Sequence, residues 1–233
     1  MKLFSGTRAP LGESQFLEAD AAFFYDKHAR RFMGQIYRRF SARAAGLILP
    51  GNRVLDAGTG TGLLAAVLAK ANPDWKITGI DVSESMLVVA RETAARNGLS
   101  DRIKFQAGSA DALPFADGSF DLVASNTSLH CWSDPVKVFN ELARVTAPGG
   151  YCLIWDNRRA NAANPFLKIL GGVMGMNKPQ RSLWINACRS AYTTGEVKKL
   201  LKESALNGAR VSKIPRLLML GIEWRREILN IKS

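Results

Sequence analysis

The nine residues VLDAGTGTG (54–62) constrain the fold of this chain more than any other stretch. An apolar strand ends at Asp56, three glycines follow at alternate positions, and the Ala- and Leu-rich segment 63–70 then favours a helix. Glycine has no Cβ, so the backbone N–H groups of such a turn can approach a bound molecule closely. Together these features predict a nucleotide or nucleoside site at the carboxyl end of a parallel strand.

The spacing of the glycines argues against the commonest nucleotides. Counted from Gly58, the dinucleotide fingerprint G-x-G-x-x-G/A needs a small residue where this chain has Leu63. The phosphate-binding pattern G-x-x-x-x-G-K-[ST] is absent from the sequence, and the carboxylate of Asp56 would repel a pyrophosphate. The turn therefore suits a ligand that presents hydroxyl groups and an ammonium group.

The composition predicts one globular domain that comprises residues 1–233. Apolar residues make up 47% of the chain and charged residues 22%, and no apolar run reaches the 18 residues or so of a membrane span. The first 11 residues contain no apolar leader. The three cysteines are isolated and there are only two histidines, so we expect a cytoplasmic protein without a disulfide set or a metal centre.

The net charge of +12 is concentrated in the last third of the chain. Residues 1–156 contain 17 basic and 16 acidic side chains, whereas residues 157–233 contain 15 basic and 4 acidic ones. Such a basic segment could bind an acidic substrate, a nucleic acid or an anionic membrane surface. A solvated basic face that aids solubility explains the same charge.

Strand-like and helix-like segments alternate along the chain, which predicts a parallel sheet with right-handed crossovers. Strands are expected at 53–56, 76–81, 103–108, 120–125 and 151–156, with a tight turn at 148–150. Helices are expected between these strands at 63–71, 84–97 and 135–144. The amphipathic segment 13–45 predicts two further helices that cap the sheet.

After residue 156 the alternation stops. Segment 157–164 is polar, and helices are expected at 166–176, 182–191 and 194–205. Two last strands, 210–214 and 217–224, could pair antiparallel.

A second acid, Asp81, ends the strand that follows the glycine turn. It lies 19 residues after Gly62, where a carboxylate can accept hydrogen bonds from both ribose hydroxyls of an adenosine. Aspartate also caps strand-to-helix loops for purely structural reasons. The combination with Asp56 and three glycines favours the ligand-binding interpretation.

Because of the glycine turn, Asp56 and Asp81, the chain resembles the class I S-adenosylmethionine-dependent methyltransferases. It is most similar to the small-molecule type that includes the ubiquinone/menaquinone biosynthesis C-methyltransferases. The matching stretches are VLDAGTGTG (54–62), GIDVSESMLVVAR (79–91), GSADALPFADGSFDLVASNTSLHCW (108–132) and ELARVTAPGGYCLI (141–154). The resemblance implies a Rossmann-like α/β fold with a seven-stranded, mostly parallel sheet of order 3-2-1-4-5-7-6, the last strand antiparallel. Helices would cover both faces, with a helical cap at 13–45 and another inserted at 157–192.

The resemblance also implies a cofactor, S-adenosyl-L-methionine, and the residues that would bind it. Those residues are Asp56, Ala57, Gly58, Thr59, Gly60 and Gly62 for the amino-acid part, Asp81 for the ribose, Val82 and Met86 for the adenine, Ser109, Ala110 and Asp111 for the adenine edge, Asn126 near the sulfonium, and Tyr25 and Arg30 folded over the cofactor. The family usually has Asp where this chain has Ser109, whose hydroxyl makes a weaker hydrogen bond. Arg31 is as good a candidate as Arg30 from its spacing.

The proposed catalytic residues are His130 and Asn126. A sulfonium is an activated methyl donor, so in-line SN2 transfer mainly needs alignment and a desolvated nucleophile. His130 is the best candidate for a base, although it could instead be a structural histidine packed with Trp132. Cys131 lacks the Pro-Cys context of cytosine C5 enzymes and is expected in the core.

The acceptor is expected to be a small molecule bound under the two caps. Apolar residues of the inserted segment suggest an apolar cap, namely Phe166, Leu170, Met174, Met176 and Trp184. Basic residues there would favour an acidic acceptor, namely Arg158, Arg159, Lys168, Lys178, Arg181 and Arg189.

Two other functions stay open. One is a nucleic-acid methyltransferase that uses the basic C-terminal third, although the [DNS]-P-P-[YFW] motif for a flipped base is absent. The other is a protein that binds the cofactor without catalysis. The chain is expected to be a monomer or a homodimer.

Overall fold

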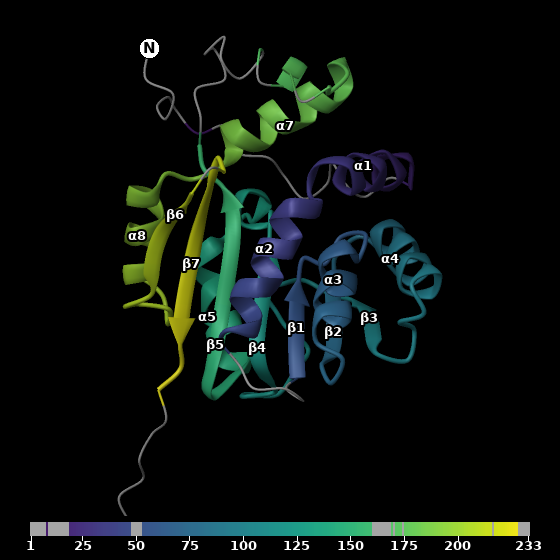
Figure 1. The fold of residues 1–233 in the computed structure, drawn as a ribbon. Helices are drawn as coiled ribbons and strands as arrows, with labels where there is room; N and C mark the ends of the chain where they lie inside the picture. Colours follow the sequence, from purple (N-terminus) through teal and green to yellow (C-terminus); the bar gives the residue numbers. More distant parts are fainter. Residues whose placement is uncertain are drawn as a thin grey trace, which may run out of the picture.

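The computed structural model describes residues 8, 19–47, 53–159, 169, 171–173, 175–215 and 217–227. Within these residues the centre of the molecule is a seven-stranded sheet with helices on both faces (Figure 1). Its strands are β1 (Arg53–Ala57), β2 (Lys76–Asp81), β3 (Ile103–Ala107), β4 (Phe120–Asn126), β5 (Thr146–Asn157), β6 (Arg210–Ile214) and β7 (Met219–Arg225).

The order across the sheet is β3-β2-β1-β4-β5-β7-β6. Strands β1 to β5 pair in parallel, and β7 pairs antiparallel with both β5 and β6. The order and the antiparallel last strand confirm the fold that the family resemblance implied. Because the parallel strands all point the same way, their carboxyl ends meet at one edge of the sheet, where ligands bind in open α/β folds.

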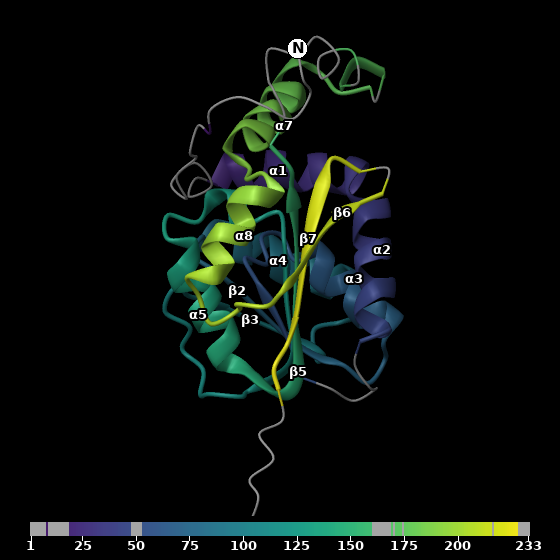
Figure 2. The ribbon, with the colours of Figure 1, turned by 90° about the vertical axis from the view of Figure 1, so that its left-hand side faces the viewer.

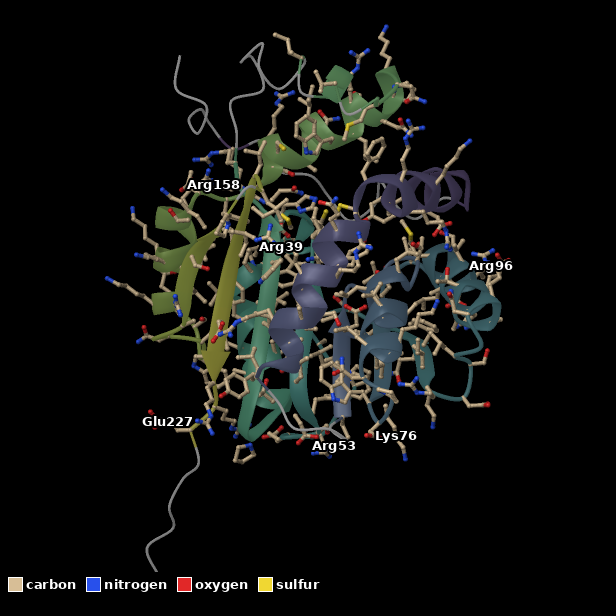
Figure 3. The ribbon with its side chains drawn as sticks, viewed as in Figure 1. Arg39, Arg53, Lys76, Arg96, Arg158 and Glu227 are labelled. Carbon is tan, nitrogen blue, oxygen red and sulfur yellow. The ribbon has the colours of Figure 1, made fainter. Side chains whose placement is uncertain are left out.

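The helices are α1 (Ala19–Phe32), α2 (Gly34–Ala45), α3 (Leu63–Ala71), α4 (Glu84–Arg96), the 3₁₀ helix η2 (Leu129–Cys131), α5 (Pro135–Val145), α7 (Lys178–Ser190) and α8 (Thr194–Lys202). Figures 1 and 2 show α2 and α3 on one face of the sheet and α5 and α8 on the other. Helices α1 and α7 lie beyond the carboxyl edge (Figure 2). Figure 3 shows Arg53 and Lys76 at the opposite, amino edge, and Arg158 at the carboxyl edge.

Each face of the sheet buries its own apolar cluster. The cluster under α5 and α8 contains Phe139 and Leu55, and the cluster under α2 and α3 contains Val54 and Phe40. The ring of Phe40 meets that of Trp155 edge-on, with 5.3 Å between the centroids. Because both faces are covered, successive residues of β1 point into opposite clusters, and both Val54 and Leu55 are apolar and buried.

Capping residues explain where several helices begin. The side chain of Ser83 accepts a hydrogen bond from the backbone of α4, and the side chain of Asp134 does the same for the backbone N–H of Lys137 in α5. Asn177 and Gln180 form a reciprocal capping box at the start of α7. This box begins α7 at residue 178, four residues before the start that we predicted.

Other boundaries also differ from the prediction: α8 ends at Lys202 rather than at 205, and β7 spans Met219–Arg225 rather than 217–224. The predicted turn at 148–150 lies inside β5, where the pairing of β4 and β5 shifts register between Phe120 and Leu122. The strand β5 therefore continues through the predicted turn with an irregular register against β4. Helices α1 and α2 account for 19–45 of the predicted N-terminal cap, while residues 13–18, 160–168, 170 and 174 lie outside the described residues.

Candidate active site

The glycine turn leaves β1 at Ala57 and is held against β2. The backbone N–H groups of Gly58 and Thr59 both donate to the carbonyl oxygen of Ile80, at 2.9 and 3.0 Å. Gly58, Gly60 and Gly62 have φ angles of +73°, +53° and +73°. Left-handed backbone at three alternate positions is the physical reason for the G-x-G-x-G pattern.

The three glycines differ in what surrounds them. A Cβ on Gly58 would overlap Ser128, and one on Gly62 would lie 3.0 Å from Phe105, so these two positions serve close packing. A Cβ on Gly60 would meet only the ring of Tyr25, at 3.9 Å. Gly60 therefore leaves space beside the turn that a ligand can occupy.

That space is part of a cavity of about 170 Å³ at the carboxyl edge of the sheet. The turn, α1, α2, η2, α7 and the ends of β2, β4 and β5 surround it. Its lining consists of Tyr25, Met33, Tyr37, Gly58, Thr59, Gly60, Thr61, Leu63, Leu64, Ile80, Asp81, Val82, Met86, Gly108, Ala110, Asn126, Thr127, Ser128, His130, Cys131, Trp132, Asn157, Leu183, Trp184 and Ala187. Residues from seven separate stretches of the sequence, 25–37, 58–64, 80–86, 108–110, 126–132, 157 and 183–187, thus form one site.

Asp81 joins the tip of β2 to the glycine turn. One carboxylate oxygen accepts the backbone N–H of Gly60 at 2.8 Å, and the other accepts that of Ser83 at 3.0 Å. Burial raises the pKa of Asp81, and these backbone hydrogen bonds oppose the rise. A carboxylate has about four lone-pair directions, so Asp81 retains capacity for ligand hydroxyls.

Asp56 lies beneath the turn rather than on the cavity wall. Its side chain is buried, and one oxygen accepts the hydroxyl of Thr59 at 2.8 Å. Burial, together with the nearby carboxylate of Asp81, raises the pKa of Asp56 from 3.8 to about 7, although the Thr59 hydrogen bond lowers it. In this structure Asp56 organises the turn, and its expected contact with a cofactor stays a prediction.

Asn126 ends β4 with an amide group that has no partner. Its side chain is 6% exposed and borders the cavity, and across the described residues neither amide atom is hydrogen-bonded. The next residue, Thr127, has a φ angle of +57°, a strained conformation for a β-branched residue. A buried, unpaired amide is costly unless a ligand or water satisfies it, so Asn126 points to ligand binding.

His130 of η2 is paired with Asp156 at the end of β5. Its Nδ1 lies 2.8 Å from Oδ1 of Asp156, and its backbone N–H donates to Oδ2 at 3.3 Å. Burial favours the neutral ring, but the Asp156 carboxylate and the neighbouring Cys131 together raise the pKa of His130 well above its usual 6.5. His130 borders the cavity beside Trp132. This position agrees both with a base that acts on an acceptor and with a structural histidine packed with Trp132.

Tyr25 of α1 and Tyr37 of α2 meet at the cavity wall near the turn. Their side chains hydrogen-bond to each other, and Tyr25 also hydrogen-bonds to Thr127. Burial raises the pKa of both tyrosines, so their hydroxyls are neutral at physiological pH. Tyr25 packs on Met86 of α4, which places α1 over the predicted adenine side of the cavity.

Several predicted cofactor residues do not border the cavity, namely Asp56, Ala57, Gly62, Ser109, Asp111 and Arg30. Ser109 hydrogen-bonds to Asp111, which also contacts Lys137 at 3.3 Å. Arg30 donates to Asp26 at 2.6 Å and to Thr93 at 2.9 Å, which holds its guanidinium against α4.

Sequence reasoning missed Met33, Tyr37, Leu183 and Ala187 in the cavity wall. Met33 precedes α2 and lies four residues before Tyr37, and Leu183 lies four residues before Ala187 on α7, so a helical repeat was the available signal. Cys131, expected in the core, is half-buried and borders the cavity.

The inserted segment was expected to place basic residues over the acceptor. Among the described basic residues of the inserted segment, Arg158, Arg159, Lys178, Arg181 and Arg189, none borders the cavity. The described part of the chain contains no group of three or more His, Cys, Asp or Glu side chains that could hold a metal ion. No helix in the described ranges is long and apolar enough to cross a membrane.

The sequence matches the methyltransferase domain family over residues 48–213. It is 38% identical over 120 residues to the 27-O-demethylrifamycin SV methyltransferase of Amycolatopsis mediterranei, covering 51% of this chain and 44% of that protein. It is 39% identical over 120 residues to the demethylmenaquinone methyltransferase of Thermus thermophilus, covering 51% of this chain and 54% of that protein. The chain therefore spans about half the length of the curated relatives it matches.

Solved structures share the fold at low sequence identity. A crystal structure from Methanococcus maripaludis superposes with a TM-score of 0.76 at 20% identity and covers 97% of this chain and 100% of that one. Phosphoethanolamine N-methyltransferase 2 of Haemonchus contortus, solved in complex with S-adenosyl-L-methionine, superposes with a TM-score of 0.69 at 16% identity. That alignment covers 93% of this chain and 60% of the Haemonchus chain.

Proposed function

Because the chain belongs to the methyltransferase domain family, we propose that it transfers a methyl group from S-adenosyl-L-methionine to a small-molecule acceptor. One observation carries the proposal: the unpaired amide of Asn126 borders the same cavity as the Asp81 carboxylate and the open side of Gly60. Polar groups suited to a charged nucleoside therefore converge next to an apolar pocket.

Different residues along the cavity would hold the different parts of this cofactor. Asp81 would accept the ribose hydroxyls, and Val82 and Met86 would pack on the adenine. The backbone at Gly58–Gly60, with Tyr25 opposite, would hold the amino-acid part, and the Asn126 amide would lie beside the sulfonium. When bound, the cofactor supplies a methyl group that is already activated for displacement.

The acceptor would occupy the apolar end of the cavity. Met33 at the N-cap of α2, Leu183 and Trp184 of α7, and Trp132 after η2 provide apolar surface there. These side chains would align the acceptor with the methyl group and keep water away from it. The names of two relatives specify a demethylmenaquinone and a demethylrifamycin as acceptors, which supports a largely apolar, cyclic molecule.

His130 is the proposed base, and Asn126 is the proposed polar contact close to the methyl group. Both border the cavity, from η2 and from the end of β4. An acceptor recognised through a basic cap has less support, since Arg158, Arg159 and Arg181 do not border the cavity.

The test has a binding step and a turnover step. Calorimetry should show that the wild type binds S-adenosyl-L-methionine and that Asp81→Asn binds it about 10- to 100-fold more weakly, since each lost charge-assisted hydrogen bond is worth about 1.5–3 kcal/mol. Asp74→Asn, the same change in an exposed turn, is the control. No binding by the wild type would refute the proposal.

Methyl transfer from labelled cofactor to a panel of phenols, quinols, amines and carboxylic acids would then identify the acceptor class. Cofactor binding without turnover on any acceptor would support the non-catalytic alternative. An affinity for RNA that falls steeply with salt would support the nucleic-acid alternative.

A further inference from the structure

A helical hairpin beyond the carboxyl edge of the sheet exposes two apolar side chains. The hairpin consists of the helical residues 169 and 171–173, the turn at 175–177, and α7. Figures 1 and 2 show it at the end of the molecule beyond α1. Ile169 is 63% exposed and Val173 is 80% exposed, which makes them the most exposed large apolar side chains of the described residues.

Two glycines set the direction of these side chains. A Cβ on Gly171 would lie 2.9 Å from Cγ of Arg181, so only glycine lets the first helix pack so closely against α7. Gly175 has a φ angle of +70° and ends this helix in left-handed backbone. Ile169 and Val173 lie two positions on either side of Gly171, about 200° away around the helix, and therefore point away from α7.

Helix α7 separates the cavity from a basic outer face. Its side chains that border the cavity are Leu183, Trp184 and Ala187. Its basic side chains are Lys178, Arg181 and Arg189. At about 100° per residue, the basic residues fall within an arc of about 80°, on the side of the helix opposite Ala187. Lys178 and Arg189 are exposed, so this face meets the surroundings of the protein.

The charge near the hairpin has one sign. Residues 157–195 contain six basic side chains and no acidic one. The next acid along the chain, Glu196, is paired with Arg159 at 2.8 Å. Arg31 of α1 adds to the charge, because a Cβ on Gly175 would lie 3.1 Å from its Nη2. Positive charge and exposed apolar surface therefore occur together at this end of the molecule.

We propose that the hairpin docks the protein onto an anionic membrane surface. Ile169 and Val173 enter the boundary between headgroups and acyl chains, and the basic face of α7 contacts the lipid phosphates. A nucleic acid fits the charge but not the apolar pair, because aliphatic side chains offer bases neither stacking nor hydrogen bonds. A basic face that only aids solubility gives no reason for apolar side chains at the most exposed positions.

Docking in this orientation places the cavity one helix away from the bilayer. The outer face of α7 contacts the lipid, and its inner face forms the apolar cavity wall. An apolar acceptor dissolved in the bilayer then reaches the cavity past the edge of α7. This consequence rests on the proposed function, whereas the docking does not.

The first experiment is sedimentation of the full chain with lipid vesicles, without cofactor or acceptor. The protein should bind vesicles in which about one lipid in three is anionic phosphatidylglycerol, and should release them as the salt concentration rises. Vesicles of neutral phosphatidylcholine should bind far less protein. No binding to the anionic vesicles, or equal binding to both kinds, would overturn the proposal.

A first pair of substitutions removes the apolar contact. Ile169→Ser combined with Val173→Ser should weaken binding to the anionic vesicles by about 10-fold, because both side chains enter the lipid boundary. Val88→Ser is the matched control, since Val88 is 49% exposed on α4, outside the hairpin. An unchanged affinity in the double variant, or the same loss in the control, would contradict the proposed contact.

A second pair removes positive charge from the outer face of α7. Lys178→Gln combined with Arg189→Gln should weaken binding by about 30-fold at low salt, since each basic side chain near an anionic surface contributes about fivefold. The control is Lys76→Gln combined with Lys104→Gln, at exposed positions of β2 and β3. Figure 3 shows Lys76 at the opposite, amino edge. Equal losses in the two pairs would mean that net charge alone drives binding, and the hairpin would lose its role.

Binding to single-stranded RNA is measured in the same buffers. An affinity for RNA that Lys178→Gln with Arg189→Gln lowers, together with no binding to vesicles, would assign the basic face to nucleic acid and overturn the proposal. Because vesicle binding needs neither S-adenosyl-L-methionine nor an acceptor, its result is independent of the calorimetry that tests the proposed function.

Discussion

Replacing Asp56 with asparagine should stabilise the protein at alkaline pH. Asp56 is 1% exposed, and burial raises its pKa from 3.8 to about 7, with a contribution from Asp81 and an opposing hydrogen bond from Thr59. A folded-state pKa above the unfolded one means that the folded protein binds the proton more tightly. The contribution of Asp56 to stability is therefore fully present below pH 3.8 and is lost as the pH rises from there through about 7.

The size of this decline follows from the two pKa values of Asp56. The interval from 3.8 to about 7, at about 1.4 kcal/mol per pKa unit, makes the ionised carboxylate about 4 kcal/mol unfavourable at pH 8. At pH 5 the stability lost through Asp56 is only about 2 kcal/mol, because the carboxyl of the folded state is still protonated. Asparagine has no such linkage and keeps an acceptor for the Thr59 hydroxyl.

The assay is urea unfolding of the wild type and of Asp56→Asn at intervals from pH 5 to pH 8.5. The difference in unfolding free energy should move in favour of Asp56→Asn by about 2–3 kcal/mol between pH 5 and pH 8. Asp74→Asn, in an exposed turn, should show a constant difference. A difference for Asp56→Asn that is constant with pH, or that moves towards the wild type, would refute a raised pKa and mean that the buried site stabilises the charged form.

Three other changes test the fold and the cavity. Gly58→Ala should destabilise the protein by more than Gly98→Ala. Both glycines have a positive φ, which costs about 1–2 kcal/mol in any other residue, but only at Gly58 would the added Cβ also overlap Ser128. Equal losses of unfolding free energy in urea would contradict this reasoning. Phe139→Ala should lower the unfolding free energy by about 3–5 kcal/mol, since this ring of α5 is fully buried in the core. A loss below about 1 kcal/mol would contradict that packing. Trp184→Ala should raise KM for the acceptor while the cofactor affinity measured by calorimetry stays the same, and a matching loss of cofactor affinity would place Trp184 at the other end of the cavity.

Much of the fold was readable from the sequence because its signals are local. The G-x-G-x-G spacing predicted a tight glycine turn after β1, and the positive φ angles of Gly58, Gly60 and Gly62 show why glycine occupies these positions. Helix bounds were predicted closely where a capping residue begins the helix, as Ser83 does for α4. The strand order came instead from the resemblance to a family, since no local pattern determines which strands are neighbours.

The least accurate boundaries were those that depend on neighbouring strands. The segment 148–150 (Pro-Gly-Gly) was expected to be a turn, but it lies inside β5, where the backbone of Gly149 and Gly150 exchanges hydrogen bonds with Arg226. Propensity cannot anticipate such contacts, because the hydrogen bonds come from Arg226, a residue far along the chain.

The sequence by itself determined that Asp56, Asp81 and the glycine turn occur together at the ends of neighbouring strands. Only the tertiary structure decided that these acids differ, with Asp81 on the cavity wall and Asp56 beneath the turn. It also decided that Asp156 hydrogen-bonds to the imidazole of His130, 26 residues away, which no short sequence motif contains. The reason is physical: spacing sets which backbone a residue can adopt, whereas burial, partners and proton affinity depend on what the fold packs against it.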